Sequence, residues 1–260
     1  MKVAVFAGLA LGVFGSVFGA DLFLAGDSTL ESCVVDGVKR EPYRSWGESL
    51  CPQLKEGNRI RNFARSGHST RMFVENGVWQ HLLAEVKSGD YVLVQFGHND
   101  QKHTTAEQCR TQFASPEGLY REYLLRFVKE TREKGATPLL CTPIVRATFD
   151  ESGKKLVDTV WALDGITLGS YAKIVRNIGA ETGVDVVDMN RLTGELCEKV
   201  GREESYKFFV ISTDLVRGKD GEPSKDVTHP IQRGADAFAD LFVKDVLSRK
   251  LSIAGLFLNN

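Results

Sequence analysis

The sequence has almost no excess of charge of either sign. Its 260 residues carry a formal net charge of -1 at pH 7, so they lack the basic surplus that draws proteins to nucleic acids or acidic membranes. Tandem repeats and low-complexity tracts are also absent. We therefore expect an ordinary globular protein, with no nucleic-acid partner and no membrane partner once the N-terminal segment described below is removed.

Cysteine is scarce, and its spacing is not that of a metal site. No Cys-x-x-Cys pair or histidine cluster has metal-ligand spacing, so we predict no structural zinc. The five cysteines are an odd number, so at least one stays unpaired even in an exported protein. Cys33 and Cys51 could form a disulfide. Cys141 lies in an apolar run and is expected to be buried.

The N-terminal segment has one basic residue, Lys2, and then an apolar run from Val3 to Ala20 that only Gly and Ser interrupt. This pattern is typical of a secretory signal peptide. An uncleaved membrane anchor is the alternative; the run is long enough, but its glycines and weak positive flank disfavour it. Cleavage after Gly19 fits the small-residue rule better than cleavage after Ala20. We predict a signal peptide over 1–20, a single domain over 21–260, and a secreted or periplasmic location.

Short apolar runs alternate with amphipathic stretches through the predicted mature chain. The runs predict strands at 22–25, 59–64, 91–96, 137–141 and 184–187, which are nearly continuous, as expected for strands covered on both faces. Helical patterns occupy 45–54, 78–87, 118–134, 168–182, 190–199 and 231–249. This alternation favours a single α/β domain with a parallel sheet between helices. Long loops at 146–165 and 206–225 are expected to shape a binding site.

Four polar stretches could carry chemistry. Three follow predicted strands, namely Gly26-Asp27-Ser28, the segment 62–71 and Gly97-His98-Asn99-Asp100, and the fourth, 226–230, precedes the last helix. Parallel strands end at one edge of a sheet, so the first three stretches should gather there.

A nucleophile, a base and an orienting acid could come from two of these stretches. Ser28 needs an imidazole to accept its proton before it can attack a carbonyl, and His229 with Asp226 three residues earlier could supply that pair. Asp226 could instead be a turn or helix-capping residue, and His229 a solvated loop histidine.

Two further residues could stabilise an oxyanion. Gly67 can offer a backbone N–H without a side chain in the way, and Asn99 can offer a neutral amide N–H; the backbone N–H of Ser28 would be a third donor. Simple turn geometry is the alternative role for Gly67, and local backbone capping is the alternative for Asn99. Packing or substrate contact is expected for His98, and Asp100 is expected to hold its loop.

In this order the four stretches resemble the signature blocks of the SGNH (GDSL) hydrolase superfamily, and most closely its rhamnogalacturonan acetylesterases (carbohydrate esterase family twelve). The matching residues are Ala25-Gly26-Asp27-Ser28-Thr29, Gly67-His68-Ser69-Thr70-Arg71, Phe96-Gly97-His98-Asn99-Asp100 and Asp226-Val227-Thr228-His229-Pro230. The resemblance implies a flavodoxin-like α/β/α fold with a five-stranded parallel sheet.

The resemblance also implies a secreted serine esterase that removes acetyl groups from a pectic polysaccharide and needs no metal or organic cofactor. It assigns Ser28 as nucleophile, His229 as base, Asp226 as its orienter, and Ser28, Gly67 and Asn99 as the oxyanion hole. Acetylated xylan, a short-chain lipid or an aryl ester remain alternative substrates, and a non-catalytic carbohydrate-binding protein is the alternative of another class. We expect a monomer.

Aromatic residues could stack on sugar rings, although most aromatic rings are buried. The candidates are Trp46, Trp79, Phe149, Trp161 and Tyr171.

Overall fold

The computed structural model describes residues 19–259 apart from 33, 36–37, 159–164 and 219. The signal peptide predicted over 1–20 lies almost entirely outside this range and stays a prediction. None of the helices in the described part is long and apolar enough to cross a membrane.

The predicted parallel sheet is confirmed. It contains β1 (Asp21–Gly26), β4 (Arg59–Asn62), β5 (Tyr91–Gln95), β6 (Thr137–Cys141) and β7 (Asp185–Val187), in the spatial order β4-β1-β5-β6-β7. All four pairings are parallel, so the strands end at a common carboxyl edge. A separate antiparallel pair is formed by β2 (Val34–Val35) and β3 (Val38–Lys39).

Alternate residues of β1 enter different cores. Leu22 and Leu24 belong to one buried cluster, and Phe23 and Ala25 belong to the other. This alternation follows from the two-residue period of a strand. It explains why β1 is apolar from Leu22 to Ala25, since both of its faces are covered.

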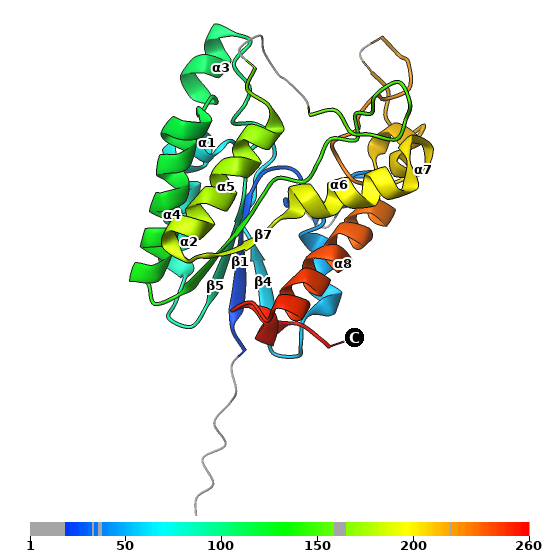
Figure 1. The fold of residues 1–260 in the computed structure, drawn as a ribbon. Helices are drawn as coiled ribbons and strands as arrows, with labels where there is room; N and C mark the ends of the chain where they lie inside the picture. Colours follow the sequence, from blue (N-terminus) through cyan, green and yellow to red (C-terminus); the bar gives the residue numbers. More distant parts are fainter. Residues whose placement is uncertain (1–18, 33, 36–37, 159–164, 219, 260) are drawn as a thin grey trace, which may run out of the picture.

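Helices cover both faces of the sheet, as predicted (Figure 1). One face carries α1 (Thr70–Glu75), α2 (Val78–Glu85), α4 (Arg121–Glu133) and α5 (Leu168–Thr182), and the other carries η1 (Glu48–Gln53), α6 (Met189–Val200) and α8 (Gln232–Arg249). The structure is therefore the three-layer α/β/α domain that was expected.

Local chemistry explains the elements that the sequence predicts best. The bounds of α5 are as predicted, because Thr167 and Ser170 form a capping box at its start and Gly183, at φ 66°, ends it in the left-handed conformation. The helix predicted at 118–134 is instead a short π-helical turn, η2 (Pro116–Tyr120), followed by α4, because Gly118 has non-helical dihedral angles. The helix predicted at 45–54 is the 3-10 helix η1, which contains Pro52.

Short elements in the connecting segments were not predicted. They are the helices α1, α3 (Ala106–Thr111), α7 (Arg202–Tyr206), η3 (Val210–Ser212) and η4 (Ala254–Leu256), together with the strands β2 and β3. Each of these helices has six residues or fewer, which is too few for a clear helical period.

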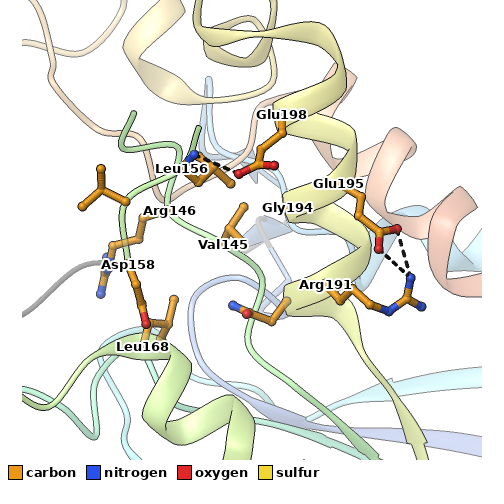
Figure 2. Close-up of a pocket in the computed structure, with 11 residues that line it drawn as sticks. Val145, Arg146, Leu156, Asp158, Leu168, Arg191, Gly194, Glu195 and Glu198 are labelled. Atoms are coloured by element: carbon orange, nitrogen blue, oxygen red, sulfur yellow. Dashed lines mark hydrogen bonds and ion pairs between the residues drawn. The ribbon is translucent and has the colours of Figure 1, made fainter. Parts of the chain in front are cut away.

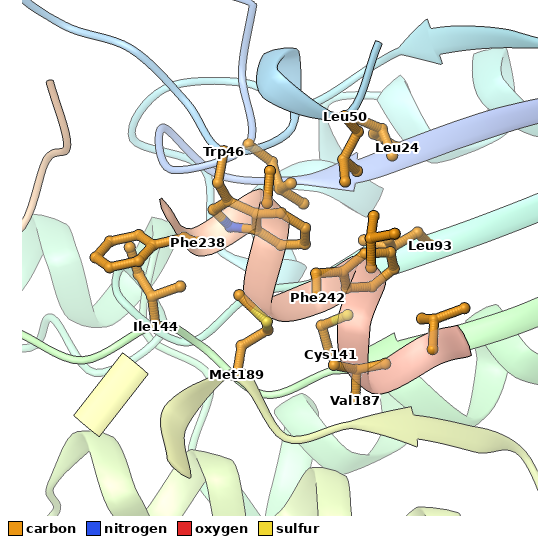
Figure 3. Close-up of a cluster of buried hydrophobic side chains, with 14 of the residues drawn as sticks. Leu24, Trp46, Leu50, Leu93, Cys141, Ile144, Val187, Met189, Phe238 and Phe242 are labelled. Carbon is orange, nitrogen blue, oxygen red and sulfur yellow. The ribbon is translucent and has the colours of Figure 1, made fainter. Parts of the chain in front are cut away.

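The larger core lies between the sheet and α8 (Figure 3). The Trp46 ring packs against Phe242 with ring centroids 5.3 Å apart. Trp46, Trp79 and Tyr171 are fully buried, which removes them as sugar-stacking candidates. Phe149 is half-buried, and Trp161 lies outside the described residues.

The cysteines divide between core and surface. Cys141 is buried, as predicted. The suggested disulfide between Cys33 and Cys51 is wrong, because Cys51 is an exposed free thiol; Cys33 itself is outside the described residues.

Phe242→Ala should destabilise the fold strongly. Phe242 is fully buried, and truncation of such a ring leaves a cavity that costs about 3–5 kcal/mol. Urea denaturation would measure the loss. Leu241→Ala on the same helix is the control, because Leu241 is only partly buried and should lose much less. Equal losses in the two variants would contradict the packing described here.

Candidate active site

Hydrogen bonds between Asp27 and Thr29, the residues on either side of Ser28, stabilise the turn that carries Ser28. Asp27 is fully buried, and its Oδ1 accepts hydrogen bonds from the backbone N–H and the hydroxyl of Thr29 at 2.9 and 2.8 Å. This clasp closes the turn directly after β1 and leaves the Ser28 side chain partly exposed at the carboxyl edge of the sheet.

Ser28, His229 and Asp226 are joined in series. Ser28 Oγ lies 2.8 Å from His229 Nε2, and His229 Nδ1 lies 2.7 Å from Asp226 Oδ2. A carboxylate only accepts hydrogen bonds, so Nδ1 must carry the proton and Nε2 must accept from the Ser28 hydroxyl. The structure therefore brings together the three residues expected from the sequence, and both ring nitrogens of His229 are engaged.

Asp226 also shapes the loop on which it lies. Its Oδ1 accepts from the backbone N–H groups of Thr228 and His229 at 2.9 and 3.0 Å. Burial raises the pKa of Asp226, but these bonds and the nearby His229 outweigh it, so the net pKa is lowered. Asp226 is thus a turn residue and the partner of His229 at once, and it remains a carboxylate.

Neighbouring backbone anchors the loop that holds His229. The Val210 N–H donates to the carbonyl of His229 at 3.0 Å, and the Ile211 N–H donates to that of Asp226 at 2.9 Å. Part of the loop predicted at 206–225 therefore positions the imidazole, through the short helix η3.

Gly67 and Asn99 lie in two turns that contact each other. Asn99 Nδ2 donates to the carbonyl of His68 at 3.0 Å. Gly67 has φ +75°, and its carbonyl accepts from Gln112 Nε2 at 2.8 Å. The positive φ of Gly67 therefore fits the turn role considered for it. The Asn99 amide donates to the backbone of a different turn, so it does not have the local capping role considered for Asn99.

Two backbone donors remain available at this edge. Within the described part of the chain, neither the Ser28 N–H nor the Gly67 N–H donates to another protein group. Open space surrounds the position where a Gly67 side chain would begin. The Arg65 N–H donates to the carbonyl of Gly26 at 2.9 Å, which places the turns of Ser28 and Gly67 side by side.

Asp100 holds its loop, as expected. Its Oδ1 accepts from the backbone N–H and the hydroxyl of Thr70 at 2.9 and 2.6 Å. Burial is the main cause that raises the pKa of Asp100 to about 7, and the nearby Asp27 carboxylate adds to it. His98 is buried as well, in agreement with a packing role, and burial lowers its pKa well below the usual value, so its ring is neutral.

Three residues at the site were not singled out from the sequence. The edge of the Tyr43 ring faces His229, with ring centroids 5.8 Å apart. Lys102 Nζ donates to Asn99 Oδ1 at 2.7 Å. Arg146 donates to Thr228 Oγ1 at 2.6 Å and to the carbonyl of His98 at 3.3 Å.

Two of these three have a sequence signal. Arg146 follows an apolar strand at the same edge of the sheet, which is the reasoning that points to the other three turns, and Lys102 lies two residues after the stretch 97–100 that follows β5. Tyr43 lies where neither a strand end nor a motif directs attention.

A cavity of about 310 Å³ adjoins the site on the side of Arg146. It lies between the segment 145–158 and α6, where Glu198 bonds to Leu156 and Arg191 pairs with Glu195 (Figure 2). The described part of the predicted loop 146–165 therefore lines a hollow next to the catalytic edge.

A search of the described residues gives no group of three or more His, Cys, Asp or Glu side chains arranged to hold a metal ion. The polar groups gathered here are instead those of acid–base and nucleophilic chemistry. A hydroxyl, an imidazole and a carboxylate joined in series are the arrangement found in serine hydrolases of several folds.

The chain belongs to the GDSL-like lipase/acylhydrolase family, whose model matches residues 22–242. It is therefore a carboxylic ester hydrolase. One relative, the rhamnogalacturonan acetylesterase RhgT of Bacillus subtilis strain 168, is 33% identical over 225 residues, which cover 86% of this chain and 88% of that protein. A second from the same strain, the probable rhamnogalacturonan acetylesterase YesY, is 31% identical over 86% of this chain and 91% of its own length.

Solved structures share the fold. The Bacillus subtilis protein YxiM matches with a TM-score of 0.70 at 24% identity, over 90% of this chain and 58% of that chain. A variant of the acetyl-xylooligosaccharide esterase Axe2 from Geobacillus matches with a TM-score of 0.56 at 19% identity, over 88% of this chain and 95% of that chain.

Asp100→Asn should change how stability depends on pH. Between the unfolded pKa of 3.8 and the folded pKa of about 7, the folded chain holds a proton that the unfolded chain has released, so stability falls as pH rises through this window. An asparagine can still accept from Thr70 but does not titrate. The variant should therefore lose less stability than the parent between pH 5 and pH 8 in urea denaturation.

The matched control is Asp240→Asn, which removes a carboxylate from the exposed surface and should leave the pH profile of the parent unchanged. Parallel pH profiles for the parent and Asp100→Asn would show that Asp100 titrates normally in the folded chain.

Proposed function

We propose that this ester hydrolase is a carbohydrate acetylesterase that acts through Ser28, with acetylated rhamnogalacturonan as its preferred substrate class. The observation that carries the mechanism is the continuous series of Ser28 Oγ, the His229 imidazole and the Asp226 carboxylate, with distances of 2.8 and 2.7 Å. The names of two relatives that match most of the chain support the substrate.

The first step forms an acetyl-enzyme. Ser28 Oγ attacks the carbonyl carbon of the acetyl ester as His229 Nε2 takes its proton, and the same nitrogen then protonates the departing sugar oxygen. Asp226 stabilises the imidazolium through Nδ1. In the second step His229 takes a proton from water, the hydroxide attacks the acetyl carbon, and acetate leaves as Ser28 recovers its proton.

Three donors stabilise the oxyanion of both steps. They are the backbone N–H groups of Ser28 and Gly67, which have no partner among the described residues, and the second N–H of the Asn99 amide. Donors fixed in advance around the developing charge are worth roughly 3–4 kcal/mol each.

Export is part of the proposal. The apolar run with one preceding lysine at residues 1–20 supports a cleaved signal peptide and a secreted or periplasmic enzyme. Such a location suits a polymeric substrate that does not enter the cell.

Ser28→Ala should abolish acetate release from acetylated rhamnogalacturonan, because among the described residues no other hydroxyl is bonded to His229. It should leave the thermal midpoint nearly unchanged, because the side chain is only partly buried. Ser66→Ala is the control, since it removes an exposed hydroxyl from the adjacent turn and should retain activity. Acetylated xylan and 4-nitrophenyl acetate should be assayed in parallel.

Release from the pectic substrate and from 4-nitrophenyl acetate but not from xylan, lost in Ser28→Ala, is the expected result. Release from xylan alone would retain the acetylesterase and refute the pectic substrate. No release from any of the three esters would refute the catalytic proposal and favour a carbohydrate-binding protein.

Asn99→Ala should lower kcat by roughly a hundredfold or more, with little change in KM, because the lost N–H acts on the transition state rather than on the bound ester. Asn99→Asp, which keeps the shape but offers an acceptor in place of the donor, should be at least as slow. Steady-state kinetics on 4-nitrophenyl acetate would measure both. Unchanged kcat in Asn99→Ala would remove this side chain from the oxyanion hole.

A further inference from the structure

Lys102 folds back over the turn that carries Asn99. The Lys102 backbone N–H donates to the carbonyl of Asn99 at 3.1 Å, which closes a tight turn after β5. Its side chain returns across that turn, and Nζ donates to Asn99 Oδ1 at 2.7 Å. The lysine therefore contacts Asn99 twice, at the backbone carbonyl through its own N–H and at the side-chain amide oxygen through its ammonium group.

The Asn99 amide is fixed in one orientation by opposite partners. On one side Oδ1 accepts from the ammonium of Lys102, which has only donors, and on the other Nδ2 donates to the carbonyl of His68, which can only accept. Rotating the amide by half a turn would place nitrogen against ammonium and oxygen against carbonyl. One Nδ2 hydrogen is used by the His68 carbonyl, and no other acceptor in the described part of the chain bonds to this nitrogen.

We propose that Lys102 is a positioning residue of the esterase reaction, which orients and polarises the Asn99 amide so that its free N–H stabilises the oxyanion. This inference rests on the proposed function, and it adds a role for a residue that does not itself touch the reacting atoms.

The physical reason is the low polarity of the surroundings. Asn99 is 3% exposed, and a charge-assisted hydrogen bond in such a place is stronger than one in water. An ammonium on the amide oxygen draws electron density from the nitrogen and makes its N–H groups more acidic. The effect grows as negative charge develops on the oxyanion, so it lowers the barrier without tightening ground-state binding.

The ammonium is held near other charges of both signs. Burial is the main cause that lowers the pKa of Lys102; the Arg146 guanidinium lowers it further, whereas the Asp27 carboxylate raises it. Lys102 is partly buried, and its ammonium group lies in the electrostatic field of these two charged residues.

The test compares three changes on the neutral substrate 4-nitrophenyl acetate, so that attraction of an anionic sugar plays no part. Lys102→Met keeps the aliphatic stem and removes the donor; kcat should fall about tenfold, which is less than the loss expected from removing Asn99 itself, and KM should stay within about twofold. Lys102→Arg should recover much of the rate. Lys173→Met, which removes an exposed charge on α5, should leave both constants unchanged.

A double-mutant comparison separates positioning from other roles. In the Asn99→Ala background, Lys102→Met should cost no further activity, because the amide on which it acts is gone. Multiplied losses would overturn the proposal and assign Lys102 an independent role. A raised KM or a lowered thermal midpoint with unchanged kcat would also overturn it.

A second measurement does not depend on turnover. The side-chain amide signal of Asn99, assigned in a ¹⁵N–¹H spectrum by its loss in Asn99→Ala, should shift in Lys102→Met and stay in place in Lys173→Met. An unmoved signal would overturn the proposal even in an active enzyme. If the enzyme cleaves 4-nitrophenyl acetate but no acetylated polysaccharide, the substrate proposal is refuted. The role of Lys102 is then still decided by the aryl-ester kinetics and the amide signal.

Discussion

The position of Ser28 depends on a chain of hydrogen bonds between four fully buried side chains. Trp46 Nε1 donates to Gln95 Oε1 at 2.9 Å, Gln95 Nε2 donates to the Thr29 hydroxyl at 2.6 Å, and that hydroxyl donates to Asp27 Oδ1 at 2.8 Å. A buried polar group without its partner costs about 1–3 kcal/mol, so each link keeps the next in place. The turn that carries Ser28 is thereby bonded to the core and to the end of β5.

The four segments of the site form one connected structure. The Arg65–Gly26 bond joins the first two turns, and the Asn99–His68 and Thr70–Asp100 bonds join the second turn to the third. Arg146 connects the third turn to the fourth through His98 and Thr228. Donors aimed at a developing charge are effective when they need no rearrangement during the reaction. Hydrogen bonds between turns supply that rigidity, which a single loop could not.

The sequence predicts the central architecture well because the physics there is local and repetitive. Apolar runs predict the strands, helical periodicity predicts α5 and α8, and strand ends gather the turns of Ser28, Gly67 and Asn99 at one edge. Asp226 and His229 precede α8, and their residue types and spacing suggest them as partners of Ser28. The sequence predicts the connecting elements poorly. Short helices such as α3 carry too few residues for a period, Tyr43 comes from a segment outside the four polar stretches, and the Lys102 side chain returns across its own turn. A sequence pattern does not show where such a side chain will lie in space. Arg146, by contrast, follows the end of a strand, which is the rule that identified the other turns.

Buried charge is the cost of this arrangement. Asp27 and Asp100 are both fully buried, burial is the main cause that raises the pKa of each, and the Asp27 carboxylate raises the pKa of Asp100 further. Two apolar residues in their places would be more stable, since burying ionised groups is unfavourable. Yet each carboxylate accepts from a backbone N–H in a turn of the site, that of Thr29 or Thr70. An apolar residue cannot fix a peptide in this way. The orientation of the peptides around Ser28 therefore depends on groups that weaken the fold, and this trade of stability for rigidity is expected where donors must be in place before the charge appears.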